Sequence, residues 1–182
     1  DTADGAVWVG TPRGLARILG GRITSFVGRD GYPQGGIRAI HEDRAGNLWI
    51  GNRAGLHRLR TDSVTTFTRA NGLTSNNVSV IGEEPDGTLW IGTFDGGVNK
   101  LKRGSTRFSR YTVAQGLRSN DVSAILCDGQ YVWIGTLDGN LHLVRNDRAL
   151  ALPAGEGASA GHALQILDDR RGSLWVSGQR GI

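Results

Sequence analysis

Short apolar runs bounded by polar residues and glycine recur along this chain at nearly constant spacing, each with a tryptophan at its centre. Typical runs are 47–52 (Asn-Leu-Trp-Ile-Gly-Asn) and 88–93 (Thr-Leu-Trp-Ile-Gly-Thr). A period of about 40 to 50 residues built from short strands is typical of β-propeller blades, whereas helical repeats would show a 3.6-residue apolar spacing that is absent here. The five tryptophans, Trp8, Trp49, Trp90, Trp133 and Trp175, are 41, 41, 43 and 42 residues apart.

The third repeat shows most clearly how one unit is built. Turns through Asp86-Gly87 and Asp95-Gly96 separate its apolar runs, and Asp-Gly is a strong hairpin signal. Four antiparallel strands of this kind make one propeller blade. We expect these strands, A to D, at residues 78–81, 88–92, 98–102 and 107–112.

Across residues 1–182 the predicted strands run BCD, then ABCD three times, then AB. The sequence therefore predicts an all-β propeller fragment of about four four-stranded blades, with 17 strands and no required helix. Along strand B, the apolar neighbours of each tryptophan face away from the tryptophan itself, so both faces are expected to be buried between blades. The five tryptophans are predicted to be equivalent, buried core residues.

Composition agrees with many short strands and tight turns, since the chain has 29 Gly and 7% aromatic residues. It contains no Met, even at position 1, so we expect a processed chain or a piece of a longer one. No run approaches the roughly 20 apolar residues of a membrane span, and we expect no membrane contact by this segment. The single Cys127 excludes an internal disulfide and is expected to be a small buried hydrophobe.

The net charge is +4, carried mainly by arginines spread singly along the chain. Nucleic-acid binding would favour a basic run interleaved with aromatic residues, and neither is present. We therefore expect no nucleic-acid partner.

Residues that could perform chemistry follow the repeat. One acidic position recurs in Asp43, Glu84, Asp128 and Asp169, which favours a structural role in closing the A-to-B turn over a catalytic one. His57 and His142 share a place on strand C and are expected to be exposed. The sequence shows no metal-ligand pattern, nucleophile motif or phosphate-binding loop, so we expect no catalytic residue, metal or cofactor.

The repeat resembles the two-component regulator propeller family. The resemblance rests on Asn-x-Val-x-x-Ile, x-Leu-Trp-Ile-Gly-Thr and Gly-Leu-x-Arg-Leu, and on Asn76-Asn77-Val78 and Asn120-Asp121-Val122. The fourth repeat departs from it over residues 152–157, and Ser177 replaces a glycine. In the family such repeats fill the extracytoplasmic sensor region of hybrid histidine kinases and of some GGDEF signalling proteins.

The resemblance implies a periplasmic or extracytoplasmic sensor module that binds a small molecule or oligosaccharide and has no enzymatic activity of its own. Two alternatives stay open: a propeller enzyme, of lyase or hydrolase type, and a scaffold for protein partners. A second copy of the chain, paired through open blade edges, is a further expected partner. The B-to-C turns and the D-to-A links are expected to lie on one face and to present polar side chains to the ligand. The expected contacts there are Arg13, Arg53, Arg180, Arg69, Arg118, Asn76, Asn77, Asn120, Asp121 and His162.

Overall fold

A computed structural model of the chain describes residues 5–29, 31–61, 63–145, 147–152 and 163–178. Within these residues, 17 strands form five antiparallel sheets in which each strand pairs with the next along the chain. The incomplete first sheet contains β1 (Val7–Thr11), β2 (Gly14–Leu19) and β3 (Arg22–Ser25). Three complete sheets of four strands follow. The second sheet contains β4 (Ala39–Glu42), β5 (Leu48–Gly51), β6 (Leu56–Arg60) and β7 (Ser63–Phe67), and the third contains β8 (Val78–Glu83), β9 (Leu89–Thr93), β10 (Gly97–Leu101) and β11 (Phe108–Tyr111). The fourth contains β12 (Val122–Cys127), β13 (Val132–Thr136), β14 (Leu141–Arg145) and β15 (Arg148–Ala151). The last sheet contains β16 (Ala163–Asp168) and β17 (Leu174–Gly178).

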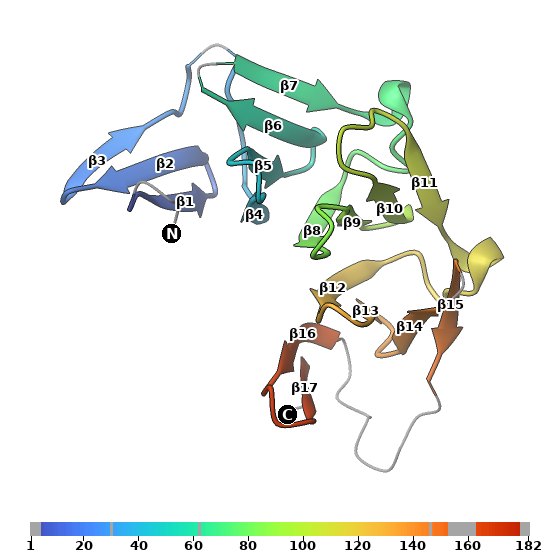
Figure 1. Cartoon of the computed structure of the whole chain (residues 1–182). Helices are drawn as coiled ribbons and strands as arrows, with labels where there is room; N and C mark the ends of the chain where they lie inside the picture. The colour runs from blue at the N-terminus through green and yellow to red at the C-terminus, as the bar shows by residue number, and fades with distance from the viewer. Residues whose placement is uncertain (1–4, 30, 62, 146, 153–162, 179–182) are drawn as a thin grey trace.

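The sheets stand side by side around an arc, as blades of a propeller do (Figure 1). Strands β4, β8, β12 and β16 are innermost, and neighbouring inner strands contact one another. The first blade lacks an inner strand and the fifth has only its inner two among the described residues. The predicted order BCD, three times ABCD, AB is thus confirmed.

The middle strand of each blade places alternate residues in different interblade cores. Trp90 lies in one cluster with Val122 and Ile134 of the fourth blade, and Trp49 lies in another with Val78 and Ile91 of the third. Each tryptophan therefore packs forward onto the next blade, while the isoleucine after it packs backward onto the preceding one. The predicted burial of both faces is confirmed for these blades.

The prediction that all five tryptophans are equivalent and buried was wrong. Trp49 and Trp90 are 3% and 1% exposed, but Trp175 is 53% exposed and Trp8 and Trp133 are half-buried. For Trp133 and Trp175 the cause is positional. In the described residues no blade follows β17, so nothing covers the forward face on which Trp175 lies, and Trp133 faces a blade of only two strands.

The recurring acidic residue closes the A-to-B turn, as predicted, in Asp43, Asp128 and Asp169 but not in Glu84, and in all four cases it binds the tryptophan of its own blade. Asp43 accepts backbone bonds from Ala45 (2.9 Å) and Asn47 (2.8 Å), and its second oxygen accepts from the indole Nε1 of Trp49 at 2.7 Å. The indole bond recurs in the other three pairs, Glu84 with Trp90 and Asp128 with Trp133 at 2.7 Å and Asp169 with Trp175 at 3.4 Å. The sequence analysis predicted the turn but not the hydrogen bond to the indole, although an indole N–H usually has an acceptor when it is buried.

The glycines two residues after Trp49 and Trp90, Gly51 and Gly92, set the distance between neighbouring blades. A β-carbon at Gly92 would lie 2.7 Å from Cγ1 of Val122 in the next inner strand, and one at Gly51 would lie 2.4 Å from Cγ1 of Val78. Ser177 occupies this position in the last blade, where no described strand packs in front of it.

We expect Gly92→Ala to lower the free energy of unfolding by about 1–3 kcal/mol, because the added methyl group overpacks the interface between the third and fourth blades. Urea denaturation would measure the change. Gly36→Ala is the matched control, since a β-carbon there would come no closer than 3.7 Å to any neighbour. Equal effects of the two substitutions would contradict the role of Gly92 as a spacer.

Candidate functional site

The D-to-A links and the B-to-C turns lie on one face of the arc, which we call the link face. The turn between β9 and β10 is bonded to both flanking links: Phe94 N donates to Asn77 O (2.9 Å), and Asp95 N donates to a carboxylate oxygen of Asp121 (2.9 Å). In the fourth blade Leu137 N donates to Asp121 O at 2.8 Å. The predicted proximity of links and turns is confirmed.

Two links contain a single 3₁₀ turn that the sequence analysis did not anticipate, η1 (Arg69–Asn71) and η2 (Val113–Gln115). In η2, the Thr112 side chain caps the turn and bonds to Gln115, and Gly116 ends it with φ 106°. Asn120 accepts a bond from Val113 N at 3.0 Å, just as Asn76 does from Arg69 N at 2.8 Å. The side-chain oxygens of both predicted ligand contacts thus hold the links in shape.

His57 and His142 were predicted to be exposed, and this prediction was wrong: they are 5% and 0% exposed. His142 Nε2 accepts a bond from Arg118 N (3.0 Å) in the link before its blade. His57 contacts the side chains of Asn52 (3.1 Å) and Thr66 (3.0 Å). A period-2 pattern cannot reveal this burial, because the links fold back over the start of strand C and cover it.

Asn99 occupies the same position in the third blade and plays the same part, since it accepts from Thr74 N at 3.0 Å and donates to Thr74 Oγ1 at 2.8 Å. A buried polar side chain on strand C therefore anchors a link in each of the last two complete blades. Burial lowers the pKa of His57 to about 4 and also lowers that of His142. Both histidines are therefore neutral at pH 7.

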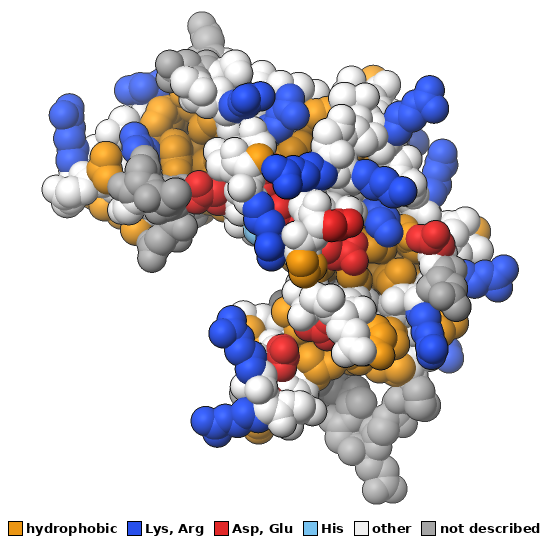
Figure 2. All heavy atoms as spheres, in the orientation of Figure 1, with side chains coloured by type: hydrophobic (Ala, Val, Ile, Leu, Met, Phe, Trp, Pro, Cys, Tyr) orange, Lys and Arg blue, Asp and Glu red, His pale blue; other side chains and the backbone are white. Residues whose placement is uncertain are grey.

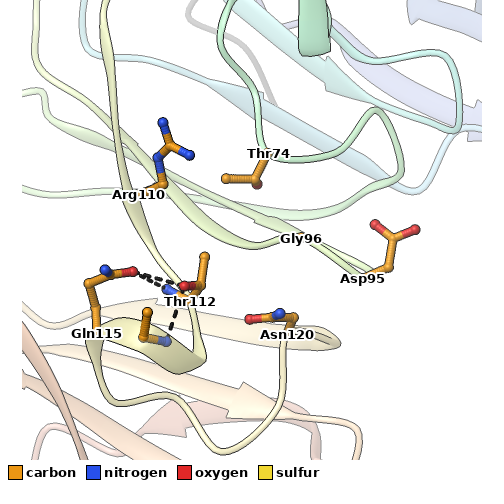
Figure 3. A pocket seen from close by; sticks show the side chains of 8 residues that line it. Thr74, Asp95, Gly96, Arg110, Thr112, Gln115 and Asn120 are labelled. Carbon is orange, nitrogen blue, oxygen red and sulfur yellow. Dashed lines mark hydrogen bonds between the residues drawn. The ribbon is translucent and has the colours of Figure 1, made fainter.

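An open pocket of about 560 Å³ lies on the link face of the third blade, between the links that precede and follow this blade (Figure 3). The β9–β10 turn supplies Asp95, the β7–β8 link Thr74, the outer strand β11 Arg110, and the β11–β12 link Asn120. The lining thus offers a hydroxyl, a carboxylate, a guanidinium and an amide. Its chemistry suits a polar ligand with several hydroxyl groups, held by hydrogen bonds.

The predicted arginines are only partly brought together. Arg13, Arg53, Arg69 and Arg118 are all exposed, but each stands on a different turn or link and none lines the pocket. On the face shown in Figure 2, Lys and Arg side chains lie along the whole arc. Arg180 and His162, also predicted as contacts, lie outside the described residues.

Arg38 and Arg110 are two residues of this face that the sequence reasoning missed. Arg38 donates to Asn77 Oδ1 at 2.5 Å and lies 5.0 Å above the ring of Phe94. Its pKa is lowered by burial and by the nearby Arg53, so the two cations stand close together. Arg110 could have been found as a charge that breaks the repeat, because Thr66 occupies the matching place on β7.

Cys127 and His41 do not line the pocket on the link face. Burial raises the pKa of the Cys127 thiol to about 12, so the thiol is protonated at neutral pH. His41 Nε2 pairs with Glu83 at 3.1 Å across two inner strands. In the described part of the chain, no three His, Cys, Asp or Glu side chains gather as metal ligands. Nor does that part contain a helix long and apolar enough to cross a membrane.

Three stretches of the chain, residues 31–54, 72–95 and 116–138, match the model of the two component regulator propeller family. Each stretch contains a link, an inner strand and the tryptophan strand of one complete blade. None of the curated proteins matches the chain in sequence.

Solved structures share the fold. The chain is 21% identical to an extracellular domain described as that of a hybrid two component system, BT3049, from B. thetaiotaomicron (TM-score 0.78, 99% of this chain, 28% of that one). The corresponding domain of BT4673 gives 23% identity and a TM-score of 0.82 over 97% of this chain and 27% of that one. Virginiamycin B lyase from Staphylococcus aureus gives 16% identity and a TM-score of 0.72, over 100% of this chain and 66% of that one. The chain thus spans less than a third of the sensor-domain structures it resembles.

Proposed function

Because the chain carries repeats of the two component regulator propeller family, we propose that it is the ligand-binding part of an extracytoplasmic sensor propeller in bacterial signal transduction. The similar structures from B. thetaiotaomicron are extracellular domains of signalling systems, which supports a location outside the cytoplasm. The segment itself senses and does not catalyse; signalling output belongs to other parts of such a protein.

The pocket on the link face is the observation that carries this proposal. Its volume of about 560 Å³ falls within the range of about 300–1,000 Å³ common for small-molecule sites. Side chains from four separate segments converge on it, and the anchored links hold them in place. Such convergence on a rigid scaffold is how propeller-like folds present loops for recognition.

An oligosaccharide is the ligand that best fits this lining. Thr74, Asn120 and Asp95 offer donors and acceptors for hydroxyl groups, and Arg110 can bind a hydroxyl or a carboxylate in a two-point contact. No aromatic ring lines the pocket, so recognition there depends on hydrogen bonds. The arginines at the B-to-C turns and in the links border this face and favour sugars that carry acidic groups.

A propeller enzyme is the competing function, because the fold is also that of a lyase. The two hypotheses differ in one observable. A sensor module returns its oligosaccharide unchanged, whereas a lyase or hydrolase converts it. Chromatography of the ligand after prolonged incubation with the protein distinguishes them.

We expect calorimetric titration of the intact protein with neutral and acidic oligosaccharides to show binding that Arg110→Ala, in the pocket lining, weakens about tenfold, equivalent to ~1.4 kcal/mol. Arg53→Ala and Arg118→Ala, on the same face outside the pocket, should weaken the binding of acidic saccharides. Arg145→Ala is the matched control, since this exposed arginine ends β14 on the opposite face. Unchanged affinity in Arg53→Ala and Arg118→Ala for a saccharide that does bind would rule out their part of the surface. Failure of every saccharide would overturn the oligosaccharide assignment.

A further inference from the structure

A second cavity, of about 300 Å³, lies between the second and third blades on the face opposite the links. The A-to-B turn of the second blade forms one wall, and the loop between β10 and β11 of the third blade forms another. Four cationic side chains surround it. Arg58 and Arg60 come from β6, and Lys102 and Arg103 come from the β10–β11 loop. We call this cavity the cationic groove.

The cations of the groove are held in place without acidic partners. The Arg58 guanidinium lies 5.7 Å from the ring centre of Trp49 and 5.9 Å from that of Phe67. Its Nε is buried and has no hydrogen-bond partner within the described residues. The Arg103 side chain lies against Gly87, where an added β-carbon would come within 2.9 Å of Arg103 Cδ. Arg58 and Arg103 thus line the groove, fixed by packing against aromatic rings and a glycine and not by a carboxylate.

Among the described residues that line the groove, Asp43 supplies the only carboxylate, and both of its oxygens are already hydrogen-bonded. Asp43 accepts the indole bond of Trp49 and three bonds from Asn47, two of which come from the amide side chain at 3.0 and 2.7 Å. Within the described residues, no ion pair involves Arg58, Arg60, Lys102 or Arg103. Four positive charges therefore face one negative charge whose oxygens are already hydrogen-bonded.

The next interblade cavity shows that this excess of positive charge is not needed for blade packing. It lies between the third and fourth blades, has a volume of about 290 Å³ and contains the equivalent Glu84–Trp90 pair. Lys100 stands where Arg58 stands, but it pairs with Asp147 at 3.8 Å. The same architecture is thus electrostatically balanced at one junction and cationic at the other.

We propose that the cationic groove binds a small polyanion that presents carboxylate, sulfate or phosphate groups. Planar guanidinium groups bind such groups through two parallel hydrogen bonds, and the cavity is large enough for one or two sugar-sized units. The anion would contact the guanidinium groups of Arg58 and Arg60 and balance the charges of Lys102 and Arg103. The proposal is independent of the link face, which lies on the other side of the blades.

Calorimetric titration of the intact protein at low salt tests the proposal with four probes: inorganic pyrophosphate, digalacturonate, a sulfated heparin disaccharide and neutral cellobiose. We expect binding of at least one anionic probe and none of cellobiose in the groove. Comparison of the three anionic probes shows whether the groove prefers phosphate, carboxylate or sulfate groups. The double variant Lys102→Gln with Arg103→Gln should weaken binding at least about tenfold, and Arg58→Gln should do the same.

Lys100→Gln is the matched control in the neighbouring cavity and should leave affinity unchanged. Lys102 and Arg103 are exposed, so their double variant stays informative even if Arg58→Gln disturbs the stacking on Trp49. Absence of binding by every anionic probe would overturn the proposal, and so would an equal loss in Lys100→Gln. If Arg53→Ala abolished binding and the groove variants did not, the anion would bind on the link face, and the proposed groove site would be wrong.

Discussion

Replacing Trp90 by Ala is expected to lower the free energy of unfolding by about 3–5 kcal/mol. The side chain is 1% exposed and packs against Tyr111 of its own blade and Val122 of the next. Its removal leaves a cavity between two blades and strands the Glu84 carboxylate without its indole donor. Denaturant unfolding monitored by circular dichroism measures the loss.

The matched control for this experiment is Trp175→Ala. The two tryptophans occupy the same place in the repeat, yet Trp175 is 53% exposed. We therefore expect the control to cost less than about 1 kcal/mol, since surface substitutions rarely cost more. A loss at Trp175 as large as that at Trp90 would show that its forward face is covered in solution, for example by a second copy of the chain.

Acidification from pH 6.5 to 4 is expected to destabilise the fold by about 3 kcal/mol through His57. Burial lowers the pKa of this imidazole from 6.5 in the unfolded chain to about 4 in the folded protein. Between these values the unfolded state binds the extra proton, so stability is fully present above pH 6.5 and falls as the pH approaches 4. Burial lowers the pKa of His142 too, which adds an effect of the same sign.

The substitution His57→Asn tests this expectation, because Asn99 already fills the equivalent position in the third blade. The variant should lose the His57 contribution to the pH dependence of unfolding between pH 6.5 and 4. Carboxylates with a lowered pKa, such as Asp43 and Asp128, lose their stabilising effect only below their ordinary value of 3.8, so they act in a separate window. An unchanged slope in the variant would assign the acid sensitivity to other groups.

Part of the candidate site was predictable because it follows the repeat. The links and B-to-C turns were placed on one face from strand order alone, since every second connection of an antiparallel meander lies at the same end. Arg110 was missed because it lies on the outer strand β11, whereas the ligand contacts were expected only in turns and links. Asn76 and Asn120 were predicted as ligand contacts, and the structure shows their side-chain oxygens bonded to link backbone; whether they touch a ligand stays a prediction.

The sequence by itself determined the blade, because period-2 alternation, Asp-Gly turns and the spacing of the tryptophans all depend on neighbours within one repeat. The environment of each residue was decided only by the tertiary structure. Trp90 and Trp175 share a motif and differ in burial, because burial depends on whether another blade packs in front of the strand. His142 lies inside because the link before its blade folds over it, and His57 because it contacts Asn52 of the β5–β6 turn and Thr66 of β7. The cationic groove arises only where two blades meet. Local pattern specifies the repeating unit, whereas contacts between units set burial, pKa and charge balance.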